Sequence, residues 1–519
     1  MSKNITLQEL DGGIVQLVFD RAKSSANIFD VATMTELNHH LDTLDGRDDI
    51  QGLILTSAKS KIFIAGADIN ELLDPNITDE LLSEMVKAGQ QTFHRIARLP
   101  YPTVATIHGA SLGGGFEIAL ACDYRIASPD RSTRIGLPET QLGILPAWGG
   151  CARLPRLIGI PKALDAILGG KRMPAKQAEK YGMVDLVVPR EHFERTARKQ
   201  IARGKPMRGL HFMTNNKVAV HIARKQASKM LWSKTRGNYP AVKEALNVIT
   251  GGVDQSMERA FDLERRATVR LVKTHACKNL VRIFFLQEKA KKLAPAGKKR
   301  DRWNPNRVAV VGAGVMGGGI AQWTASRGIP VTLRDINEQQ VLKGMAGISK
   351  LFHSAVKRRL FTKVEAARHM DRITPAGSEV PLTGTDMVIE AAVEHMPIKK
   401  QIFARLAEIS RPDTILATNT SALSVSELAE SVPKPGRVVG IHFFNPVHRM
   451  QLVEVVKGKL TSPETLDRTV QFVQQLGKLP VVVKDSPGFV VNRILMPYMN
   501  EAGILFETGA SPSKIDKVM

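Results

Sequence analysis

The sequence is poor in cysteine, and this scarcity excludes two kinds of site. Its 519 residues include three cysteines, Cys122, Cys151 and Cys277. They are widely separated and form neither a CxxC pair nor a cluster with histidine, so the pattern predicts no disulfide framework and no zinc site. The histidines include no HExxH motif either. We therefore expect a protein of a reducing compartment, the cytoplasm, with no metal centre.

Long apolar runs and leader sequences are also missing. No stretch approaches the roughly 18 consecutive apolar residues that a membrane-spanning helix needs. The N-terminus, MSKNITLQELDGG, lacks the apolar core of a secretory signal and carries acids early, unlike a transit peptide. With 43% hydrophobic and 24% charged residues, the composition is that of a globular protein. The length predicts about three domains.

Acidic residues are scarce relative to basic ones. The chain has 73 Lys and Arg against 50 Asp and Glu, a formal net charge of +23. Such a balance implies an anionic partner: nucleic acid, a membrane face or a phosphate-rich small molecule. Aromatic residues make up only 5% and no nucleic-acid-binding motif is present, so we expect no nucleic acid, while weak association with a membrane surface stays open. The basic run KAKKLAPAGKKRDR, residues 289–302, is typical of a linker.

Strand-like and helix-like stretches alternate over the first 190 residues. GIVQLVFD, IQGLILTSA and YPTVATIHG have the pattern of strands, and MTELNHHLDTL has that of an amphipathic helix. The alternation predicts an α/β unit built from βαβ-type repeats. From residue 191 to about residue 300 the β pattern fades, and the helical spacing of apolar residues predicts a helical connector.

The segment ASLGGGFEIAL, residues 110–120, places glycines next to a glutamate in an apolar stretch. A helix N-terminus presents unpaired N–H groups, and glycine lets a ligand oxygen such as an oxyanion approach them. Glu117, less than one turn further along, could then reach the reacting atoms. FIAGADI offers a second backbone donor near Ala67, and GLPE places Glu139 at the end of a predicted strand. Two carboxylates beside two donors predict acid–base chemistry at a carbonyl; the alternative is a capped helix with a solvated glutamate.

A second pattern starts at residue 306. NRVAVVGAGVMGGGIAQWTASRGIPVTLRDI predicts a strand, a glycine turn, a helix and another strand. The turn glycines, Gly312, Gly314 and Gly317, would let the backbone approach a pyrophosphate at the helix N-terminus. Asp335 ends the second strand, where it would accept hydrogen bonds from the adenine ribose and repel a 2′-phosphate. The pattern predicts a Rossmann domain that takes NAD rather than NADP; only Arg334, beside the acid, weakens this preference.

The N-terminal motifs resemble the crotonase (enoyl-CoA hydratase/isomerase) family. FIAGADI, HGASLGGGFEIALACDYRIA and GLPETQLGILPAWGG match it in order and spacing, and the match covers most of residues 1–190. The resemblance implies a ββα spiral in which the N–H groups of Ala67 and Gly114 form the oxyanion hole for a thioester. It also implies that Glu117 activates the water that adds at C3 and that Glu139 supplies the proton at C2. The presence of both acids favours hydration over isomerisation alone.

The C-terminal motifs resemble L-3-hydroxyacyl-CoA dehydrogenase. TNTSALSV, GIHFFNPVHRMQLVEVV and KDSPGFVVNRILMPYMNEA carry this resemblance. It implies that His442 is the catalytic base and that Glu454 orients it, a pairing that fixes the imidazole tautomer and raises its basicity. Ser421 and Asn492 would hydrogen-bond the substrate, and Glu394 would lie near the nicotinamide.

The order of the parts resembles the multifunctional α-subunits of fatty-acid β-oxidation complexes. This implies hydration of trans-2-enoyl-CoA to L-3-hydroxyacyl-CoA and NAD-dependent oxidation to 3-ketoacyl-CoA, with possible Δ3-Δ2 isomerisation. It also implies acyl-CoA thioester substrates and a thiolase β-subunit as partner in a hetero-oligomer. The expected fold is α/β, with a crotonase domain at 1–190, a helical connector at 191–305, a Rossmann domain at 306–485 and the first helix of a C-terminal helical domain at 486–519.

In that family the C-terminal helical domain is longer, so we expect a fragment or a truncated variant. The dehydrogenase cleft would then lack a wall, and oxidation would be weak because partial binding costs orientation. Apolar residues of ILMPYMNEAGILF would be exposed and would promote association. The alternatives are a hydratase or isomerase with an impaired dehydrogenase half and, least favoured, a nucleic-acid-binding crotonase homologue.

Overall fold

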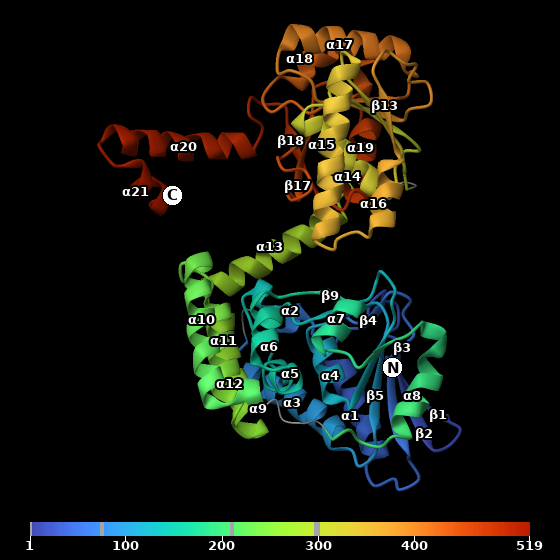
Figure 1. Cartoon of the computed structure of the whole chain (residues 1–519), viewed down its shortest axis with the longest axis vertical. Coiled ribbons are helices and arrows are strands. Elements are labelled where there is room, and N and C mark those ends of the chain that lie inside the picture. Colours follow the sequence, from blue (N-terminus) through green and yellow to red (C-terminus); the bar gives the residue numbers. More distant parts are fainter. Residues whose placement is uncertain (1–2, 73–76, 208–211, 295–301) are drawn as a thin grey trace. The chain divides into compact units, whose positions relative to one another are not determined.

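The structure, a computed structural model, describes residues 3–72, 77–207, 212–294 and 302–519 (Figure 1). The chain divides into two compact units, Met1–Phe284 and Phe285–Met519. Part of the basic run predicted to be a linker, residues 295–301, lies outside the described residues.

The N-terminal unit contains two β-sheets. In spatial order, the first consists of β1 (Ile5–Leu10), β2 (Ile14–Phe19), β3 (Gly52–Ser57), β5 (Thr103–Ile107), β7 (Tyr124–Ala127) and β10 (Leu186–Val187). The second consists of β4 (Ile62–Ile64), β6 (Ala110–Leu112), β8 (Arg134–Gly136) and β9 (Met173–Pro174). Neighbouring strands are parallel, except that β1 and β2 are antiparallel, as are β8 and β9.

The chain passes repeatedly from one sheet to the other. β3 is followed by β4, β5 by β6 and β7 by β8, and helices connect one strand pair to the next. This is the predicted ββα spiral, so the α/β class expected for this half is confirmed. Because β4 and β6 are parallel neighbours, the segments that follow them leave the same edge of the sheet. The donor segments predicted near Ala67 and Gly114 are these two segments.

The helices of the strand-containing part lie between and around the sheets. They are α1 (Val31–Leu44), α2 (Ile69–Leu72), α3 (Asp79–Arg98), α4 (Gly114–Ala121), η1 (Glu139–Leu142), α5 (Gly150–Ile158), α6 (Ile160–Leu168), α7 (Ala175–Tyr181), η2 (Arg190–His192) and α8 (Phe193–Ile201). Local signals account for the longest of them. Thr78 caps α3 by accepting the N–H of Leu81, acids occupy its first turn, and Arg95 and Arg98 occupy its last turn.

Further helices follow, as the sequence predicts for this stretch. They are α9 (Phe212–Asn215), α10 (Lys217–Thr235), α11 (Pro240–Gly252), α12 (Met257–Val272) and α13 (His275–Lys291). α11 and α12 pack against α3, α5 and α6. Ala245, Ala267 and Leu271 are buried in the same apolar core as the strands. The predicted boundary at residue 190 therefore marks where the strands end, while the compact unit continues to Phe284, within α13.

The C-terminal unit is built on one eight-stranded sheet. Its strands, in spatial order, are β13 (Ile373–Ala376), β12 (Val331–Arg334), β11 (Val308–Val311), β14 (Met387–Glu390), β15 (Ile415–Thr418), β16 (Val438–Phe443), β17 (Leu452–Lys457) and β18 (Leu479–Lys484). All neighbours are parallel except β16 and β17. The order of connection reverses between β11 and β14, which is where a doubly wound sheet binds its ligand. The predicted Rossmann fold is thus confirmed.

Helices complete this unit. They are α14 (Val315–Ser326), α15 (Glu338–Lys357), α16 (Lys363–Met370), α17 (Met396–Ile409), α18 (Val425–Ala429), η3 (Pro435–Arg437), α19 (Pro463–Gln475), α20 (Val491–Glu507) and α21 (Pro512–Val518). α20 buries none of its residues, and Ile494 and Met496 are 70% and 67% exposed. Within the described part of the chain, no helix is both long enough and apolar enough to cross a membrane.

Candidate active sites

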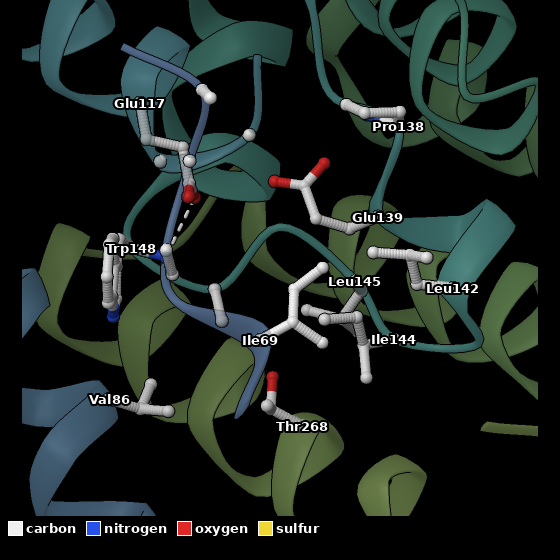
Figure 2. Close-up of a pocket in the computed structure, with 16 residues that line it drawn as sticks. Ile69, Val86, Glu117, Pro138, Glu139, Leu142, Ile144, Leu145, Trp148 and Thr268 are labelled. Carbon is white, nitrogen blue, oxygen red and sulfur yellow. Dashed lines mark hydrogen bonds between the residues drawn. The ribbon is translucent and has the colours of Figure 1, made fainter. Parts of the chain in front are cut away.

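A small apolar cavity in the N-terminal unit brings the predicted crotonase residues together. Its volume is about 100 Å³, and its walls come from β-sheet loops, from α4 and from α12 (Figure 2). Among the residues that line it are Ala67, Gly114, Glu117, Glu139, Leu142, Leu145, Trp148 and Thr268. All four crotonase residues singled out in the sequence thus face one space, and the remaining wall is largely apolar.

The two predicted backbone donors lie side by side. Gly114 begins α4, so its N–H has no partner within the helix. Gly66, next to Ala67, comes so close to the other segment that an added Cβ would lie 3.2 Å from the carbonyl oxygen of Leu112. Among the described residues, neither the N–H of Ala67 nor that of Gly114 donates to a protein acceptor. Two free donors therefore lie on neighbouring segments of the cavity wall, an arrangement that suits an oxyanion.

Glu117 is buried but well supplied with hydrogen-bond donors. Its side chain lies on α4 and the residue is 3% exposed. Oε1 accepts the backbone N–H groups of Trp148 at 2.7 Å and of Gly150 at 2.8 Å. Burial raises the pKa of Glu117 to about 7, against these N–H groups and the nearby Arg153, which lower it. The sequence did not identify the donors, because backbone groups of a distant turn leave no side-chain pattern.

Glu139 has the opposite surroundings. It lies three residues beyond the end of β8, at the start of η1, rather than at the strand end itself. Both carboxyl oxygens are buried, and neither has a hydrogen-bond partner among the described residues. Burial raises the pKa of Glu139 well above its ordinary value, and the charge of Glu117 raises it further. In Figure 2 the carboxyl groups of the two glutamates are turned towards each other. A neutral, protonated Glu139 beside an ionised Glu117 is the favoured state.

His442 and Glu454 form a buried pair in the C-terminal unit. They are direct partners across the antiparallel strands β16 and β17. The His442 Nδ1 atom lies 2.8 Å from Glu454 Oε2, and the other carboxylate oxygen accepts the N–H groups of Val490 and Val491, each at 2.9 Å. Burial raises the pKa of Glu454, but these bonds outweigh it and lower the value overall. An ionised Glu454 fixes the proton of His442 on Nδ1 and leaves Nε2 free to act as a base.

The remaining predicted dehydrogenase residues cluster around Glu394. This carboxylate accepts the side-chain hydroxyl of Thr420 and the backbone N–H of Ser421. The side-chain amide of Asn492 in turn donates to the carbonyl oxygen of Ser421 at 3.1 Å. Burial raises the pKa of Glu394, but these donors lower it overall. The structure therefore brings Ser421, Asn492 and Glu394 into one group.

A buried ion pair near Glu394 has no counterpart in the sequence predictions. Lys399 Nζ lies 2.7 Å from Glu390 Oε1 and 3.5 Å from Glu394 Oε2, and the first two side chains are almost wholly buried. Lys399 lies on α17, nine residues after Glu390. A lysine in a charged helix is usually exposed, so nothing in its spacing distinguishes it from a surface residue.

The glycine turn after β11 fits a bound dinucleotide. A Cβ on Gly317 would lie 1.8 Å from the carbonyl oxygen of Gly312, so the helix approaches the strand more closely than any side chain allows. A Cβ on Gly314 would meet nothing within 4 Å, so this position is open to a ligand. Gly314 also precedes the first residue of α14, where N–H groups and the helix dipole favour a pyrophosphate. The residues present therefore match what NAD requires at this turn.

Asp335 closes the other side of this turn. Its carboxylate accepts the N–H of Ala313 at 2.6 Å and lines a cavity of about 260 Å³ with Gly312 and Arg405. Arg334, the residue that weakened the preference for NAD, is engaged by Glu379 at 3.2 Å. A carboxylate at the strand end and a neutralised arginine are what a site for an unphosphorylated ribose needs.

Comparison with protein families assigns both halves. The model of the enoyl-CoA hydratase/isomerase family matches residues 9–246. That of the 3-hydroxyacyl-CoA dehydrogenase NAD-binding domain matches residues 307–486, and that of the C-terminal domain of the same dehydrogenases matches residues 488–519.

Solved structures are similar to one half or the other. An (S)-3-hydroxybutyryl-CoA dehydrogenase from Ralstonia eutropha is 41% identical over 41% of this chain and 75% of its own, with a TM-score of 0.40. FadB2 from M. tuberculosis is 38% identical over 40% of this chain and 74% of its own, with a TM-score of 0.40. An enoyl-CoA hydratase from Bacillus anthracis is 29% identical over 55% of this chain and 96% of its own, with a TM-score of 0.36.

Fold and sites together define an enzyme that combines a two-carboxylate thioester site with an NAD-binding domain. Residues 9–246 are an enoyl-CoA hydratase/isomerase domain, and residues 307–486 and 488–519 are the NAD-binding and C-terminal domains of a 3-hydroxyacyl-CoA dehydrogenase. This is the domain combination of multifunctional fatty-acid oxidation enzymes, so the predicted family resemblance is confirmed. NAD as cofactor and acyl-CoA compounds as substrates are confirmed with it.

Proposed function

We propose that the N-terminal unit adds water to trans-2-enoyl-CoA and that the C-terminal unit oxidises the resulting L-3-hydroxyacyl-CoA to 3-ketoacyl-CoA. One observation carries the hydratase half. In a single apolar cavity, a carboxylate held by two N–H groups faces a carboxyl group with no donor in the described part of the chain. Beside them lie two backbone N–H groups with no acceptor among the same residues. In such a site, one carboxyl group is set up as the base and the other as the acid before any substrate binds.

The hydration step follows from these surroundings. The ionised Glu117 takes a proton from water as the water oxygen bonds to C3 of the substrate. The electron pair of the double bond moves to C2, which accepts the proton of Glu139. The N–H groups of Ala67 and Gly114 bind the thioester oxygen, where negative charge develops before C2 is protonated. After one turnover Glu117 carries the proton taken from water and Glu139 is ionised. Transfer of that proton from Glu117 to Glu139, directly or through water, restores the starting state after product release.

The oxidation step uses the second site. His442 Nε2 accepts the proton of the 3-hydroxyl group, and Glu454 stabilises the positive charge that then forms on the imidazole. Ser421 and Asn492, which already contact one another, would hold the hydroxyl and thioester groups in place. NAD supplies the two-electron oxidising capacity of this step when it is bound. Gly312, Gly314, Gly317 and Asp335 would bind its pyrophosphate and adenine ribose, and Glu394 would lie near its nicotinamide.

A single assay tests both halves. Purified chain is mixed with a medium-chain trans-2-enoyl-CoA and NAD, and the absorbance of the conjugated enoyl thioester and of NADH are followed together. We expect loss of the enoyl signal followed by growth of NADH. An unchanged enoyl signal would contradict the hydratase assignment. Enoyl loss without NADH, also when L-3-hydroxyacyl-CoA is added directly, would instead support the alternative, a hydratase or isomerase with an impaired dehydrogenase half.

The chemistry of the product suggests a partner. A 3-ketoacyl-CoA is the substrate of thiolytic cleavage, so we propose a thiolase β-subunit as partner in a hetero-oligomer. Sedimentation of this chain with the β-oxidation thiolase of the same organism would test this. A faster-moving mixed species is expected, and independent sedimentation of the two proteins would contradict the proposal. We also propose a cytoplasmic location, which three free and buried cysteines favour.

We further propose that α10 is the site of weak association with an anionic membrane surface. The helix carries no acidic residue, and its exposed side combines apolar and basic side chains. Val218, Ile222 and Trp232 are 70%, 51% and 66% exposed. Basic helices with exposed aromatic residues are favoured at the interface of anionic bilayers. Chain that sediments with phosphatidylglycerol vesicles, and less so at high salt or after Trp232→Ser, would support this site, and equal binding to phosphatidylcholine vesicles would contradict it.

A further inference from the structure

One fully buried acid has no role in the mechanism above. Glu264 lies on α12 and is 0% exposed. It does not line the hydratase cavity, whereas Thr268, one turn further along the same helix, does. Glutamate is rarely buried unless it is paired or hydrogen-bonded. The burial of Glu264 therefore has to be explained by the groups that hydrogen-bond to its carboxyl group.

The carboxylate of Glu264 is surrounded by donors. It accepts the backbone N–H of Gly149 at 3.0 Å and that of Ala152 at 2.8 Å. The side-chain amide of Gln90, on α3, donates to it at 3.3 Å. Burial and the charge of Glu117 raise the pKa of Glu264 well above its ordinary value. The hydrogen bonds from Ala152 and Gln90 and the charge of Arg153 lower this pKa, but burial outweighs them.

These bonds alternate with those of Glu117 along one short turn, residues 148–152, whose last three residues begin α5. The N–H groups of Trp148 and Gly150 point to Glu117, while those of Gly149 and Ala152 point to Glu264. The two acids therefore hold residues 148–152 through different N–H groups. Both bonds to Glu117 end on Oε1. Its Oε2 accepts no hydrogen bond from the described residues, so the turn decides which oxygen remains available to a water molecule.

The turn adopts this form only with particular residues and charges. Gly149 has a φ of 110°, a left-handed value that favours glycine. A Cβ on Gly150 would lie 2.9 Å from Oε1 of Glu117, so the carboxylate approaches the bare backbone. Arg153 is attracted to both acids and offsets their charge, although burial lowers its own pKa to about 10. Without Glu264, the buried N–H groups of Gly149 and Ala152 would lose their acceptor, and the turn would reorganise.

We infer that Glu264 is a positioning residue for hydration: it holds residues 148–152 in the conformation that directs Glu117 into the cavity. The inference rests on the proposed hydratase function and adds to it a residue from α12, outside the part of the chain that carries the crotonase motifs. Because the residue does not line the cavity, its effect falls on the reaction step and not on substrate binding.

The test is a double-mutant cycle of Glu264→Gln and Glu117→Gln, with kcat and KM measured for hydration. Glutamine keeps the size of the side chain but turns an NH2 donor towards a backbone N–H. We expect Glu264→Gln to lower kcat about 10- to 100-fold, as a small displacement of a catalytic group does, with KM within about twofold. In the Glu117→Gln background, the same change is expected to alter the residual kcat less than about twofold, because its target is already lost. Glu258→Gln, an exposed acid on the same helix, is the matched control.

The outcomes separate positioning from folding. An unchanged kcat in Glu264→Gln, or an equal loss in both backgrounds, would overturn the inference, since general destabilisation does not depend on Glu117. If Glu264→Gln does not fold, Gln90→Met is the second variant, because it removes the hydrogen bond that the α3 side chain donates to the Glu264 carboxylate. It is expected to lower kcat about 3- to 10-fold, again only with Glu117 present. No loss there would overturn the inference. Inactive wild-type chain would overturn the proposed function itself, and this inference with it.

Discussion

Glu117 and Glu139 are the same side chain in different surroundings, and the difference assigns their roles. Glu117 receives two backbone N–H groups, which favour its charged form. Glu139 receives none from the residues that the structure describes, and both its oxygens are buried. A group without donors, next to a second acid, keeps its proton most easily. Above the pKa of Glu117, about 7, the pair therefore holds one proton, on Glu139.

The pH dependence of hydration follows from this arrangement. Glu117 has to be ionised to act as the base, and its pKa of about 7 means that it loses its charge as the pH falls below 7. We expect kcat/KM for hydration to fall about tenfold per pH unit on the acid side of 7. On the alkaline side it falls once Glu139, whose pKa is raised well above its ordinary value, gives up its proton. A profile that is flat between about pH 5 and pH 8 would contradict the assignment.

Substitutions at the two sites are expected to separate the two activities. Glu117→Gln removes the base of hydration and should lower its kcat by about 10²- to 10⁴-fold. Oxidation of added L-3-hydroxyacyl-CoA should then be unchanged. His442→Gln should have the reverse effect, lowering NADH formation by a similar factor and leaving hydration intact. Loss of both activities in either variant, with circular dichroism unchanged, would show that the reactions share a site.

At the scale of elements, two glycines of one turn make a matched test of the NAD site. Gly314→Ala adds a methyl group in open space, so we expect a stable protein that binds NAD about tenfold more weakly. Gly317→Ala places a methyl group against the Gly312 carbonyl, which forces α14 away from β11 and should lower the melting temperature of the C-terminal unit. Calorimetry and NAD titration would distinguish them. Equal stability of the two variants would contradict the packing described for this turn.

The elements show why the sequence predicted some parts of the sites and not others. The strands around the glycine turn and those of the first sheet follow from short apolar runs between turns, and the turn glycines follow from local spacing. Glu264 was invisible because FDLERRATVR is a charged helical stretch in which a glutamate is usually solvated. Its burial arises from the packing of α12 against α3 and α5, a contact between segments far apart in the chain. Lys399 was missed because a lysine in a charged helix is usually exposed, although its partner Glu390 is only nine residues away.

At the scale of the whole molecule, the two compact units are expected to function as separate catalysts. A mixture of the Glu117→Gln and His442→Gln chains then contains one intact site of each kind. We expect the mixture to convert trans-2-enoyl-CoA and NAD to NADH, with a longer lag than wild-type chain because the intermediate has to diffuse between molecules. Monitoring NADH from the moment of mixing measures the lag. No NADH from the mixture would contradict independent units.

The unpartnered carboxyl group of Glu139 has a consequence for heat resistance. A buried polar group without a hydrogen bond costs about 1–3 kcal/mol of the free energy of unfolding, and an apolar side chain of similar shape avoids this cost. We expect Glu139→Leu to abolish hydration and yet to raise the melting temperature of the N-terminal unit by several degrees. Differential scanning calorimetry measures this, and a lower melting temperature in the variant would contradict it. If the expectation holds, the enzyme tolerates a less heat-stable fold because its proton donor has to remain without a partner until substrate arrives.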